Sequence, residues 1–582
     1  MCEKNILVNI EGIEIDLFEY IDKNSKFLKE QYLNIIFDLS NLTLNNQPLK
    51  NQLYFQDHSL WEMSLIQEKN IYKNRYIFKT IKYLALKKII KENKNKNIEI
   101  FFLENDLANY LEKEFKTAKI IFKNKFDSFK VRIIQIIKKK IWFQFLFFKY
   151  YFLKNCTFRK LDNKVFSKKK FFIFSYFTHY DKERFNDKNF YPKQWSSLWD
   201  NIIDNSNFFQ IFLPNKKFKF FFQLENFLKK KKFKNLKNEN FINYFIFYKY
   251  FFKVFKDLKL YRSKNIYLSI VEKIKDNKDL KYFFEINEEL FISSFAGYTL
   301  LQNLLWINIF ENLFKKLPKH DYGLYIFENQ PWEKAFVRCW QKYNQGKLIG
   351  YCHTTINFWH LNYFNIEDYN RLDDFKKFSP DFIAVSSEIS KNFIVNQSIN
   401  LNKIIEVEAL RYNWILNNKV KLNNMLDKNK KILFLGDYEK NINKNLIRIM
   451  NQSKDDLIKL GFEVSFKPHP ASRVKNIDNN ITLTDRDLEK LLNDHNYIVS
   501  SNSTSAVIEA LSCGLKTFLF VDRNNLNLSP LKNTKIEKKV DFFSTKDELI
   551  YKIANSKNNL EPIEYYYLDK ELKKWKKTLK ID

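Results

Sequence analysis

Glycine is scarce in this sequence, with 8 residues among 582 where average usage predicts about 40. The shortage accompanies 60 phenylalanines, 32 tyrosines and long runs of lysine, asparagine and isoleucine, a composition typical of a chain that has drifted toward A/T-rich codons. Lysine and arginine number 99 against 67 aspartates and glutamates, which gives a net charge of +32. Such a charge favours nucleic acid, an anionic membrane surface or a phosphate-bearing ligand as partner, with codon drift as an alternative origin for much of it.

Cysteine is also rare, and its spacing shows no pairing pattern. The five cysteines are odd in number, far apart and without a CxxC pair; they are Cys2, Cys156, Cys339, Cys352 and Cys513. The pattern indicates neither a disulfide framework nor a structural zinc site. The N-terminal residues MCEKNILVNIEGIEIDLFEY carry acids where a signal peptide needs an unbroken apolar stretch. We therefore expect a reducing, cytoplasmic location.

Two segments raise the question of membrane contact. Residues 290–310 have no charged side chain and are long enough to cross a bilayer. They contain several serine, glutamine and asparagine side chains that are costly in hydrocarbon, so we interpret them as a buried helix. Residues 131–154 combine three lysines with IWFQFLFF and KYYFLKN. Such a cluster can dock on an anionic membrane face, and a core helix with solvated lysines is the alternative.

The length of the chain predicts two to four domains, at about 150 residues per domain. Hydrophobic residues make up 45% of it, which is typical of a globular chain and not of a basic disordered tail. In the first 280 residues the periodicity is blurred. We place there a helix at 76–91, strands at 98–103 and 171–177, and a solvated loop at 229–232.

From residue 321 onward, short apolar strands alternate with capped helices. The strands expected before a polar linker at 417–430 are 324–327, 347–352, 382–385 and 404–407. One helix is expected to begin at Pro331, and another to follow a cap at Ser386 or Ser387 and to end near Val395. Beyond the linker we expect strands at 431–435, 463–467, 481–483, 497–499 and 517–521 and helices at 443–460, from 485, and at 504–512. This alternation predicts an α/β fold with two doubly wound, Rossmann-like domains facing a cleft, divided near residue 417.

The first candidate site follows the strand at 463–467. Parallel sheets bind ligands beyond the carboxyl ends of their strands. In Lys467-Pro468-His469-Pro470 the two prolines limit the movement of His469, and Lys467 supplies charge. An imidazole and an ammonium group held there suit a phosphate or diphosphate, whereas a rigid turn with a surface histidine is the alternative.

The second candidate is a hydroxyl-rich turn between a strand and a helix. It comprises Ser500, Ser501, Asn502, Ser503, Thr504 and Ser505. Hydroxyls and free backbone N–H groups at a helix N-terminus form an anion site, and ordinary capping needs only one hydroxyl. We therefore predict phosphate binding there, with Gly436, which ends a nearby strand, at the same site. Glu509 lies further along the helix, where it could reach a ribose hydroxyl or face solvent.

The remaining candidates lie in the first domain. Glu328, in ENQPWE (328–333), could accept a proton from an attacking hydroxyl, with Glu333 supporting the first helical turn. His353 and His360 are alternative bases or satisfied structural histidines. Arg411, which follows a strand, could hold a carboxylate of a donor or an acceptor.

Together these motifs carry a resemblance. KPHP at 467–470 and SSNSTSAVIEALSCG at 500–514 resemble the C-terminal half of GT-B glycosyltransferases that use an HP motif and a Ser/Thr motif. That set includes bacterial sialyl- and polysialyltransferases, capsule Kdo transferases and CDP-glycerol glycerophosphotransferases. ENQPWEKAF (328–336), GYCHTTINFW (350–359) and EALRYNW (408–414) further resemble a bacterial surface-carbohydrate biosynthesis family. The resemblance covers residues 320–530.

The resemblance implies a transferase that moves a sugar, such as a nonulosonic acid or Kdo, from a CMP-linked or CDP-linked donor to a surface polysaccharide or lipid-linked glycan. It implies that His469, Ser501, Ser503 and Thr504 contact the donor phosphate and that no metal takes part. Residues 1–416 would form the acceptor-side domain with an extra N-terminal segment, 417–560 the nucleotide-sugar-binding domain, and 561–582 a helical tail. The acidic motif of sialyltransferases is not recognisable here, so Glu328 is assigned as base from its place at a strand end.

Two other functions stay open. A GT-B-type sugar-nucleotide epimerase would need acid and base groups on both faces of one sugar and no acceptor groove. A basic nucleic-acid-binding protein is suggested by the charge of +32, but the lysines are spread along the whole chain and no binding module is recognised. We expect no nucleic-acid partner and no cofactor besides the nucleotide-sugar co-substrate. Peripheral contact with the anionic inner membrane is a secondary expectation.

Overall fold

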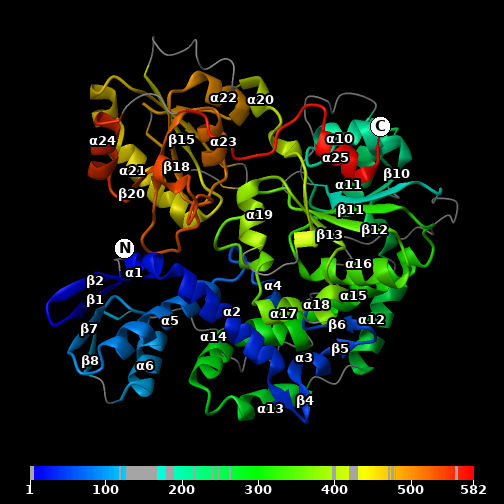
Figure 1. The fold of residues 1–582 in the computed structure, drawn as a ribbon, viewed down its shortest axis with the longest axis horizontal. Helices are drawn as coiled ribbons and strands as arrows, with labels where there is room; N and C mark the ends of the chain where they lie inside the picture. The colour runs from blue at the N-terminus through cyan, green and yellow to red at the C-terminus, as the bar shows by residue number, and fades with distance from the viewer. Residues whose placement is uncertain are drawn as a thin grey trace.

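The computed structural model describes residues 6–116, 119–125, 167–177, 189–213, 218–234, 236–237, 240–246, 248–260, 264–371, 373–395, 401–418, 430–469, 472, 477–478, 480–556 and 561–581. Within these ranges the chain forms one four-stranded sheet, two six-stranded sheets and two short hairpins. Figure 1 shows the four-stranded sheet in blue, the first six-stranded sheet in cyan and green, and the second in yellow and orange. The membrane-docking candidate at 131–154 lies outside the described residues.

The four-stranded sheet is formed near the N-terminus. Its strands run in the order β2 (Ile13–Asp16), β1 (Leu7–Ile10), β7 (Ile98–Phe101) and β8 (Ile120–Lys123). Four helices accompany it: α1 (Leu17–Lys23), α2 (Ser25–Asn41), α5 (Tyr76–Glu92) and α6 (Asn105–Glu114). The short elements between α2 and α5 are β3 (Thr43–Leu44), β4 (Gln47–Pro48), α3 (Leu49–Gln52), β5 (Tyr54–Phe55), β6 (His58–Ser59) and α4 (Leu65–Glu68). The predicted helix at 76–91 and strand at 98–103 are confirmed, although the strand ends at Phe101.

The first six-stranded sheet is parallel throughout. Its strands run in the order β10 (Ser206–Ile211), β9 (Phe171–Tyr176), β11 (Tyr322–Ile326), β12 (Lys347–Tyr351), β13 (Phe382–Val385) and β14 (Ile404–Glu406). Counted along the chain this order is 2-1-3-4-5-6, which reverses direction between β9 and β11. The predicted strands in this region are confirmed to within two residues at each end.

Helices cover both faces of this sheet. On one face Phe174 packs against Phe310 of α15 (Tyr298–Phe314) and Phe336 of α16 (Pro331–Lys342). On the other face Tyr351 packs against Trp575 of α25 (Lys573–Leu579), close to α10 (Ser196–Ile202). The connections to β13 and β14 contain α17 (Glu367–Arg371), α18 (Asp373–Lys377) and α19 (Glu388–Val395). The sheet is therefore doubly wound.

A helical insertion separates β10 from β11. Besides α15 it contains α11 (Phe221–Lys231), α12 (Tyr248–Leu260), α13 (Lys264–Lys273) and α14 (Lys278–Ala296). The prediction of a loop at 229–232 is wrong, because three of those lysines form the last turn of α11 and are exposed, which a good helix former such as lysine allows.

The apolar run at 290–310 belongs to α14 and α15. Among the described residues, 278–314 is the one helical stretch long and apolar enough to cross a membrane, and 67% of its most apolar window is buried within the protein. Most side chains of α15 are buried, and the helix packs against α16. This agrees with the interpretation of the run as a buried helix.

The second six-stranded sheet is also parallel. Its strands run in the order β17 (Thr482–Leu483), β16 (Glu463–Lys467), β15 (Lys431–Leu435), β18 (Tyr497–Ser501), β19 (Lys516–Phe520) and β20 (Asp541–Phe543). This is 3-2-1-4-5-6, the order of the Rossmann fold. Its helices are α21 (Lys440–Lys459), α22 (Leu488–Asp494), α23 (Ala506–Ser512) and α24 (Lys546–Ala554).

Alternate residues of β15 explain why both faces of the second sheet are covered. Ile432 and Phe434 join the apolar cluster that contains α21, whereas Leu433 and Leu435 join the cluster that contains α23. Side chains of a strand alternate between the two faces, so a strand buried on both sides is apolar throughout. The predicted α/β class with two Rossmann-like domains is confirmed by these two sheets.

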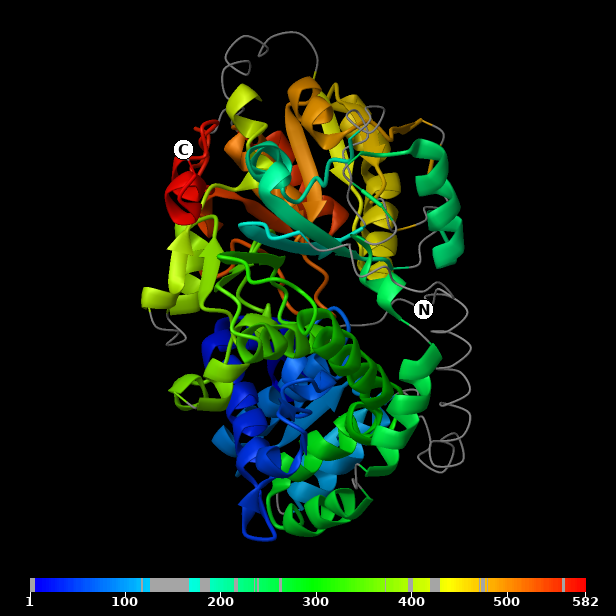
Figure 2. The same ribbon diagram turned by 90° about the vertical axis from the view of Figure 1, so that its right-hand side faces the viewer.

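The C-terminal residues return to the first sheet, as Figures 1 and 2 show for the red segment. The backbone N–H of Ala409 donates to the Tyr567 carbonyl at 2.8 Å. At the start of α25 the backbone N–H groups of Lys574 and Trp575 donate to the Glu408 carboxylate at 2.7 and 3.0 Å. The division near residue 417 stays a prediction, since residues 419–429 lie outside the described ranges.

Candidate active site

Each six-stranded sheet reverses its strand order once, and some of the predicted site residues lie at these reversals. In parallel sheets, ligands bind outside the carboxyl ends of the strands at such a point. In the second sheet the reversal lies between β15, which is followed by Gly436, and β18, which runs into the turn at 501–505. In the first sheet it lies between β9 and β11, and Glu328 follows β11.

Gly436 lets the end of β15 approach the end of β16. Its backbone N–H donates to the Lys467 carbonyl at 2.9 Å. A Cβ atom at this position would lie 2.9 Å from the backbone nitrogen of His469 and 3.1 Å from Oδ1 of Asn443. A larger residue would therefore push away the segment that carries His469. The structure thus gives Gly436 a packing role, and its predicted contact with the donor stays a prediction.

Asp437 is a buried carboxylate at this reversal and is absent from the predicted site residues. It follows Gly436 directly, and its Oδ2 accepts hydrogen bonds from the hydroxyls of Ser501 and Ser503. Its Oδ1 accepts the backbone N–H of Glu439 at 2.6 Å. The signal available was an acid in the second position after a strand, close to a glycine. Asp437 therefore ties the end of β15 to the turn after β18.

The contacts with Asp437 already occupy two of the hydroxyls in the hydroxyl-rich turn. A serine hydroxyl has one O–H to donate, and those of Ser501 and Ser503 point to Asp437. Ser500 is fully buried and donates to the Ser501 carbonyl at 3.2 Å. The helix begins at Ala506 and not at Thr504 as expected. Phosphate binding by these three serines stays a prediction, and it would require Ser501 and Ser503 to turn away from Asp437.

Thr504 and Ser505 lie on the more accessible side of the same turn. Both side chains are partly exposed. Thr504 Oγ1 accepts the backbone N–H of Ala506 at 3.3 Å and so keeps its own O–H, whereas Ser505 makes no side-chain capping bond to α23. Ser503 is partly exposed as well, but its O–H is directed to Asp437, so Thr504 and Ser505 carry the partly exposed hydroxyls of the turn that are not bonded to Asp437.

His469 lies two residues after β16 and is partly buried. Its ring meets the edge of the Tyr438 ring at a centroid distance of 5.7 Å. Burial lowers the pKa of His469, the charge of Asp437 opposes this, and the charge of Arg411 lowers it further. The imidazole is therefore neutral near pH 7 and offers one N–H donor and one acceptor. Pro470 of the predicted motif lies outside the described residues.

Lys467 points away from the place expected for it. It occupies the last position of β16, but its ammonium donates to the backbone carbonyl of Arg486, in the loop between β17 and α22. An ammonium held there stabilises that loop. Its predicted role at the donor phosphate stays a prediction.

Arg411 and Glu509 join His469 from opposite sheets. Arg411 is exposed and lies in the 3₁₀ turn Leu410–Tyr412 that follows β14. Glu509 lies on α23 of the second sheet, and burial raises its pKa to about 7 against the opposing charges of Arg411 and Lys193. The charge of Arg411 therefore reaches both Glu509 and His469. The contact of these three residues with a donor stays a prediction.

The first reversal is built around two glutamates. The carboxylate of Glu333 is buried and accepts the backbone N–H groups of Glu328 and Asn329 at 3.1 and 2.9 Å. Burial and the charge of Glu328 raise the pKa of Glu333 to about 8, against hydrogen bonds from the backbones of Gln330 and Glu328. Asn329 adopts a φ of 57°, which the carboxylate helps to hold. Glu333 thus supports the turn, as expected.

Glu328 itself is half-buried and carries the more available carboxylate. Burial raises its pKa, while a hydrogen bond from Gln330 and the charge of Lys73 oppose the shift. A carboxylate with a raised pKa at a strand end suits a proton acceptor. Its role as the base stays a prediction.

The two histidines of the first domain occupy different surroundings. His353 is buried after β12, and its role as an alternative base stays a prediction. His360 accepts the backbone N–H of Asn357 on Nδ1 at 3.3 Å, and its Nε2 lies 3.0 Å from the hydroxyl of Tyr72. Burial lowers the pKa of His360 to about 4, so it is neutral near pH 7. The Asn357 side chain also donates to the Leu528 carbonyl at 3.0 Å, which links this loop to the second domain.

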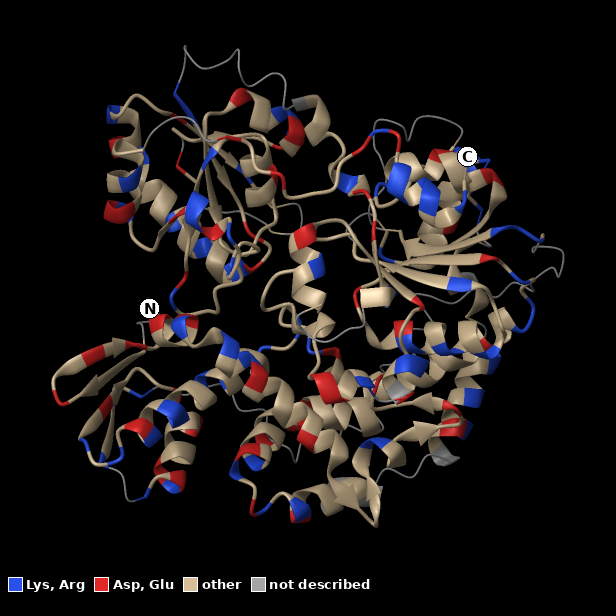
Figure 3. Cartoon of the chain, in the orientation of Figure 1, with Lys and Arg blue, Asp and Glu red and all other residues tan. Residues whose placement is uncertain are grey.

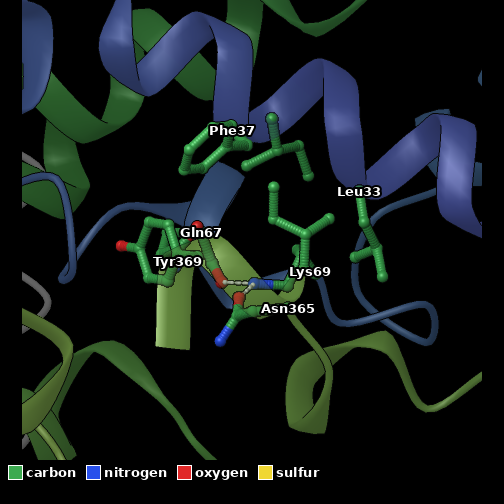
Figure 4. A pocket seen from close by; sticks show the side chains of 8 residues that line it. Leu33, Phe37, Gln67, Lys69, Asn365 and Tyr369 are labelled. Atoms are coloured by element: carbon green, nitrogen blue, oxygen red, sulfur yellow. Dashed lines mark hydrogen bonds between the residues drawn. The ribbon is translucent and has the colours of Figure 1, made fainter. Parts of the chain in front are cut away.

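A small cavity lies elsewhere, beside α2. Its volume is about 10 Å³, far below the roughly 300 to 1,000 Å³ of small-molecule sites. Figure 4 shows Lys69 inside it, donating to the Gln67 carbonyl at 3.0 Å and to Oδ1 of Asn365 at 2.8 Å. Burial lowers the pKa of Lys69 to about 7. The cavity therefore houses a buried lysine and is too small for a nucleotide sugar.

Comparisons with known proteins give weak likenesses. No protein-family model and no curated protein matches the chain. The UDP-GlcNAc 2-epimerase of Neisseria meningitidis bound to UDP-GlcNAc aligns with a TM-score of 0.33 and 12% identity, over 66% of this chain and 90% of that one. CalG4, the calicheamicin glycosyltransferase, aligns with a TM-score of 0.36 and 9% identity, over 67% and 90%. Anabaena Alr3699/HepE in complex with UDP and glucose gives 0.34 and 8%, over 67% and 90%. With TM-scores this low, the fold class is established by the two strand orders and not by these alignments.

Proposed function

We propose that the chain is a GT-B-type glycosyltransferase that moves a sugar from a CMP-linked donor to a surface polysaccharide or lipid-linked glycan. The observation that carries the proposal is that the charge of Arg411, which follows the last strand of the first sheet, acts on His469 after β16 and on Glu509 in α23 of the Rossmann-order sheet. Sheets of this order bind nucleotides at the point where the strand order reverses. The cytidine donor and the nature of the acceptor rest on the motif resemblance.

The donor phosphate is proposed to lie against Arg411 and His469. Arg411 is exposed and offers a planar set of N–H donors that matches a phosphate. The neutral imidazole of His469 adds one N–H donor, and the Thr504 and Ser505 hydroxyls lie at the adjoining turn. Glu509, with a pKa of about 7, is protonated in a large fraction of molecules near neutral pH. It then adds little repulsion and can hydrogen-bond a ribose hydroxyl.

The transfer is proposed to run by attack of an acceptor hydroxyl on the anomeric carbon. A new C–O bond forms as the bond between the sugar and the phosphate breaks, and the electron pair leaves with the nucleotide. Arg411 and His469 stabilise the charge that develops on the phosphate oxygens, a term that often dominates such catalysis. Glu328 accepts the proton of the acceptor, with His353 as the alternative base.

The charge distribution favours a small anionic ligand over nucleic acid. Figure 3 shows lysine and arginine on every part of the chain, interleaved with aspartate and glutamate. A nucleic-acid-binding face gathers Lys and Arg on one surface. We propose that the reaction takes place in the cytoplasm with peripheral contact to the anionic inner membrane, which residues 131–154 were expected to make.

The proposal is tested with the purified full chain and a panel of CMP-, CDP- and UDP-sugars. A donor that binds the native protein raises its Tm, and we expect cytidine donors to do so. Sugar transfer should require an added glycan acceptor, whereas conversion of the donor alone would indicate an epimerase. His469→Ala should abolish transfer and leave the Tm within a few degrees, and Tyr438→Phe, which alters an exposed neighbour, should retain activity. Normal turnover by His469→Ala would overturn the assignment.

A further inference from the structure

A mixed set of possible metal ligands lies outside the proposed active site. His58 in β6, Glu311 in α15 and Cys339 in α16 bring one ligand atom each to within 4.8 Å of one another. His58 and Cys339 are fully buried, and Glu311 is partly exposed. We propose that these three residues bind a zinc ion.

The distances fit the geometry of zinc. Bond lengths of about 2.0 Å to nitrogen or oxygen and about 2.3 Å to sulfur place tetrahedral ligands roughly 3.3 to 3.6 Å apart. Cys339 Sγ lies 3.6 Å from His58 Nε2, and the nearest Glu311 oxygen lies 4.0 Å from the same nitrogen. A small rotation of the Glu311 carboxylate closes the remaining gap. The fourth position is left for water on the side where Glu311 is exposed.

The chemistry of the three ligands selects zinc. A thiolate, an imidazole and a carboxylate together suit a borderline ion, whereas calcium and magnesium prefer oxygen ligands alone. Burial keeps the Cys339 thiol protonated when no ion is present, because the pKa of the thiol is raised. On binding, the S–H bond breaks, the sulfur lone pair forms the bond to zinc, and one proton passes to solvent.

A second layer of residues orients the ligands. Oδ1 of Asp57 lies 3.0 Å from Nδ1 of His58, the place of the carboxylate that commonly holds a metal-binding histidine. With the His58 proton on Nδ1, the Nε2 lone pair faces Cys339 and Glu311. Tyr343 donates its hydroxyl to the other Glu311 oxygen at 2.8 Å. Three lone pairs then converge on one point, which a cation stabilises.

Two cations border the site and balance its outer carboxylates. Arg338 lies 3.1 Å from Oδ2 of Asp57. Lys342 lies 2.7 Å from Oε1 of Glu311 and 3.5 Å from Oδ1 of Asp57. The Lys342 side chain is 36% exposed, so it can keep its contact with Asp57 when Glu311 turns to the ion. Zinc with one thiolate and one carboxylate is neutral, so binding adds no uncompensated charge beyond that of Lys342.

The site would fasten the N-terminal region to the first parallel sheet. His58 belongs to a hairpin of the N-terminal region, whereas Glu311 and Cys339 belong to the two helices that pack on Phe174.

The test uses the full chain purified without chelator. We expect about one zinc per chain by elemental analysis, and a rise in Tm when zinc chloride is added to chelator-treated protein. Replacement by Co²⁺ should give the absorption bands of a tetrahedral thiolate complex. Cys339→Ser should remove the thiolate band, and Cys352→Ser, which alters another buried cysteine outside the ligand set, should retain it. A band that survives Cys339→Ser would overturn the proposal.

A second variant keeps the test decisive where Cys339→Ser fails to fold. Glu311→Gln preserves the size of a partly exposed side chain and its contact with Tyr343. It should weaken zinc binding by tenfold or more and leave the Tm of the metal-free protein nearly unchanged. Protein that contains no zinc and is not stabilised by added zinc, or a Glu311→Gln variant that binds zinc as tightly as the wild type, would show that the three residues form only a hydrogen-bonded cluster.

Discussion

The two reversals of strand order carry opposite kinds of side chain. At the second sheet most of the groups are donors: the His469 imidazole and a turn of hydroxyls held by Asp437, and the charge of the Arg411 guanidinium reaches His469 from the first sheet. At the first sheet, the groups are carboxylates set among phenols. Burial, and then the charges of Glu328 and Glu333, raise the pKa of Tyr176.

This difference shows how two sheets of similar architecture can divide one reaction. Donors on the second sheet suit an anion that gains charge as it leaves, whereas a carboxylate with a raised pKa on the first sheet suits a proton acceptor. A protein that only binds a nucleotide needs the hydrogen-bond donors but not the carboxylate. Variants that alter the donors and the carboxylates separately should therefore affect donor binding and proton transfer separately.

The largest effect is expected at the acceptor side. Glu328→Gln keeps the size of the side chain and its contact with Gln330 but removes the proton acceptor. We expect kcat to fall by about 10² to 10⁴ with the donor-induced rise in Tm unchanged. Glu367→Gln, an exposed glutamate in the same half of the chain, serves as the control. A fully active Glu328→Gln would transfer the role of base to His353, to be tested by His353→Asn.

The next expected effect is on the pH dependence of stability, through the buried carboxyl of Glu509. The pKa of Glu509 is about 7 in the folded protein against an ordinary 4.5, so the folded protein holds a proton that the unfolded chain has released between these values. Stability is therefore lost as pH rises from 4.5 through 7, by up to about 3 kcal/mol.

In Glu509→Gln that loss should disappear. Urea unfolding at pH 4.5 and at pH 8 measures it, and the variant should gain stability relative to the wild type at the higher pH. Parallel profiles for the two proteins would contradict the raised pKa.

Removal of the Arg411 side chain should weaken donor binding and raise the pKa of His469. Charge-assisted hydrogen bonds contribute about 1.5 to 3 kcal/mol, so Arg411→Ala should raise the donor KM by about 10- to 100-fold. The Arg411 charge lowers the pKa of His469, so this pKa should rise in the variant, as measured by NMR titration. Arg411→Lys should restore the His469 pKa but only part of the affinity, because an ammonium lacks the planar donor set. Arg486→Ala, at an exposed arginine, is the control.

The second sheet could be predicted closely because its signals are local. The strands at 431–435 and 463–467 agree with the structure at both ends, since polar residues or glycine bound each apolar run. The first sheet lacks this clarity: its second strand, β10, was not predicted, and a helical insertion separates it from β11. Lysines scattered through apolar helices such as α11 blur the 3.6-residue period, and for this reason the sequence predicts a loop where the structure has the last turn of α11.

The site could be predicted only where a residue follows a strand and differs in kind from its neighbours. His469, Arg411 and Glu328 met that condition. Asp437 also follows a strand, but its importance depends on Ser501 and Ser503, which lie 64 and 66 residues further along the chain. The zinc ligands have no recognisable spacing at all. Tertiary folding alone brings such residues together.

The smallest expected effects distinguish the hydroxyls of the turn that stabilise the fold from those that bind the donor. Ser501→Ala and Ser503→Ala each remove a hydrogen bond to the buried Asp437 carboxylate, so each should lower stability by about 1 to 3 kcal/mol in urea unfolding and leave donor affinity unchanged. Thr504→Val and Ser505→Ala should do the reverse, with donor affinity reduced by about three- to tenfold. If the serine variants lose affinity instead, the turn must rotate away from Asp437 when the donor binds. Asp437 would then be a competitor for the hydroxyls that the phosphate displaces, and Asp437→Asn would bind the donor more tightly than the wild type does.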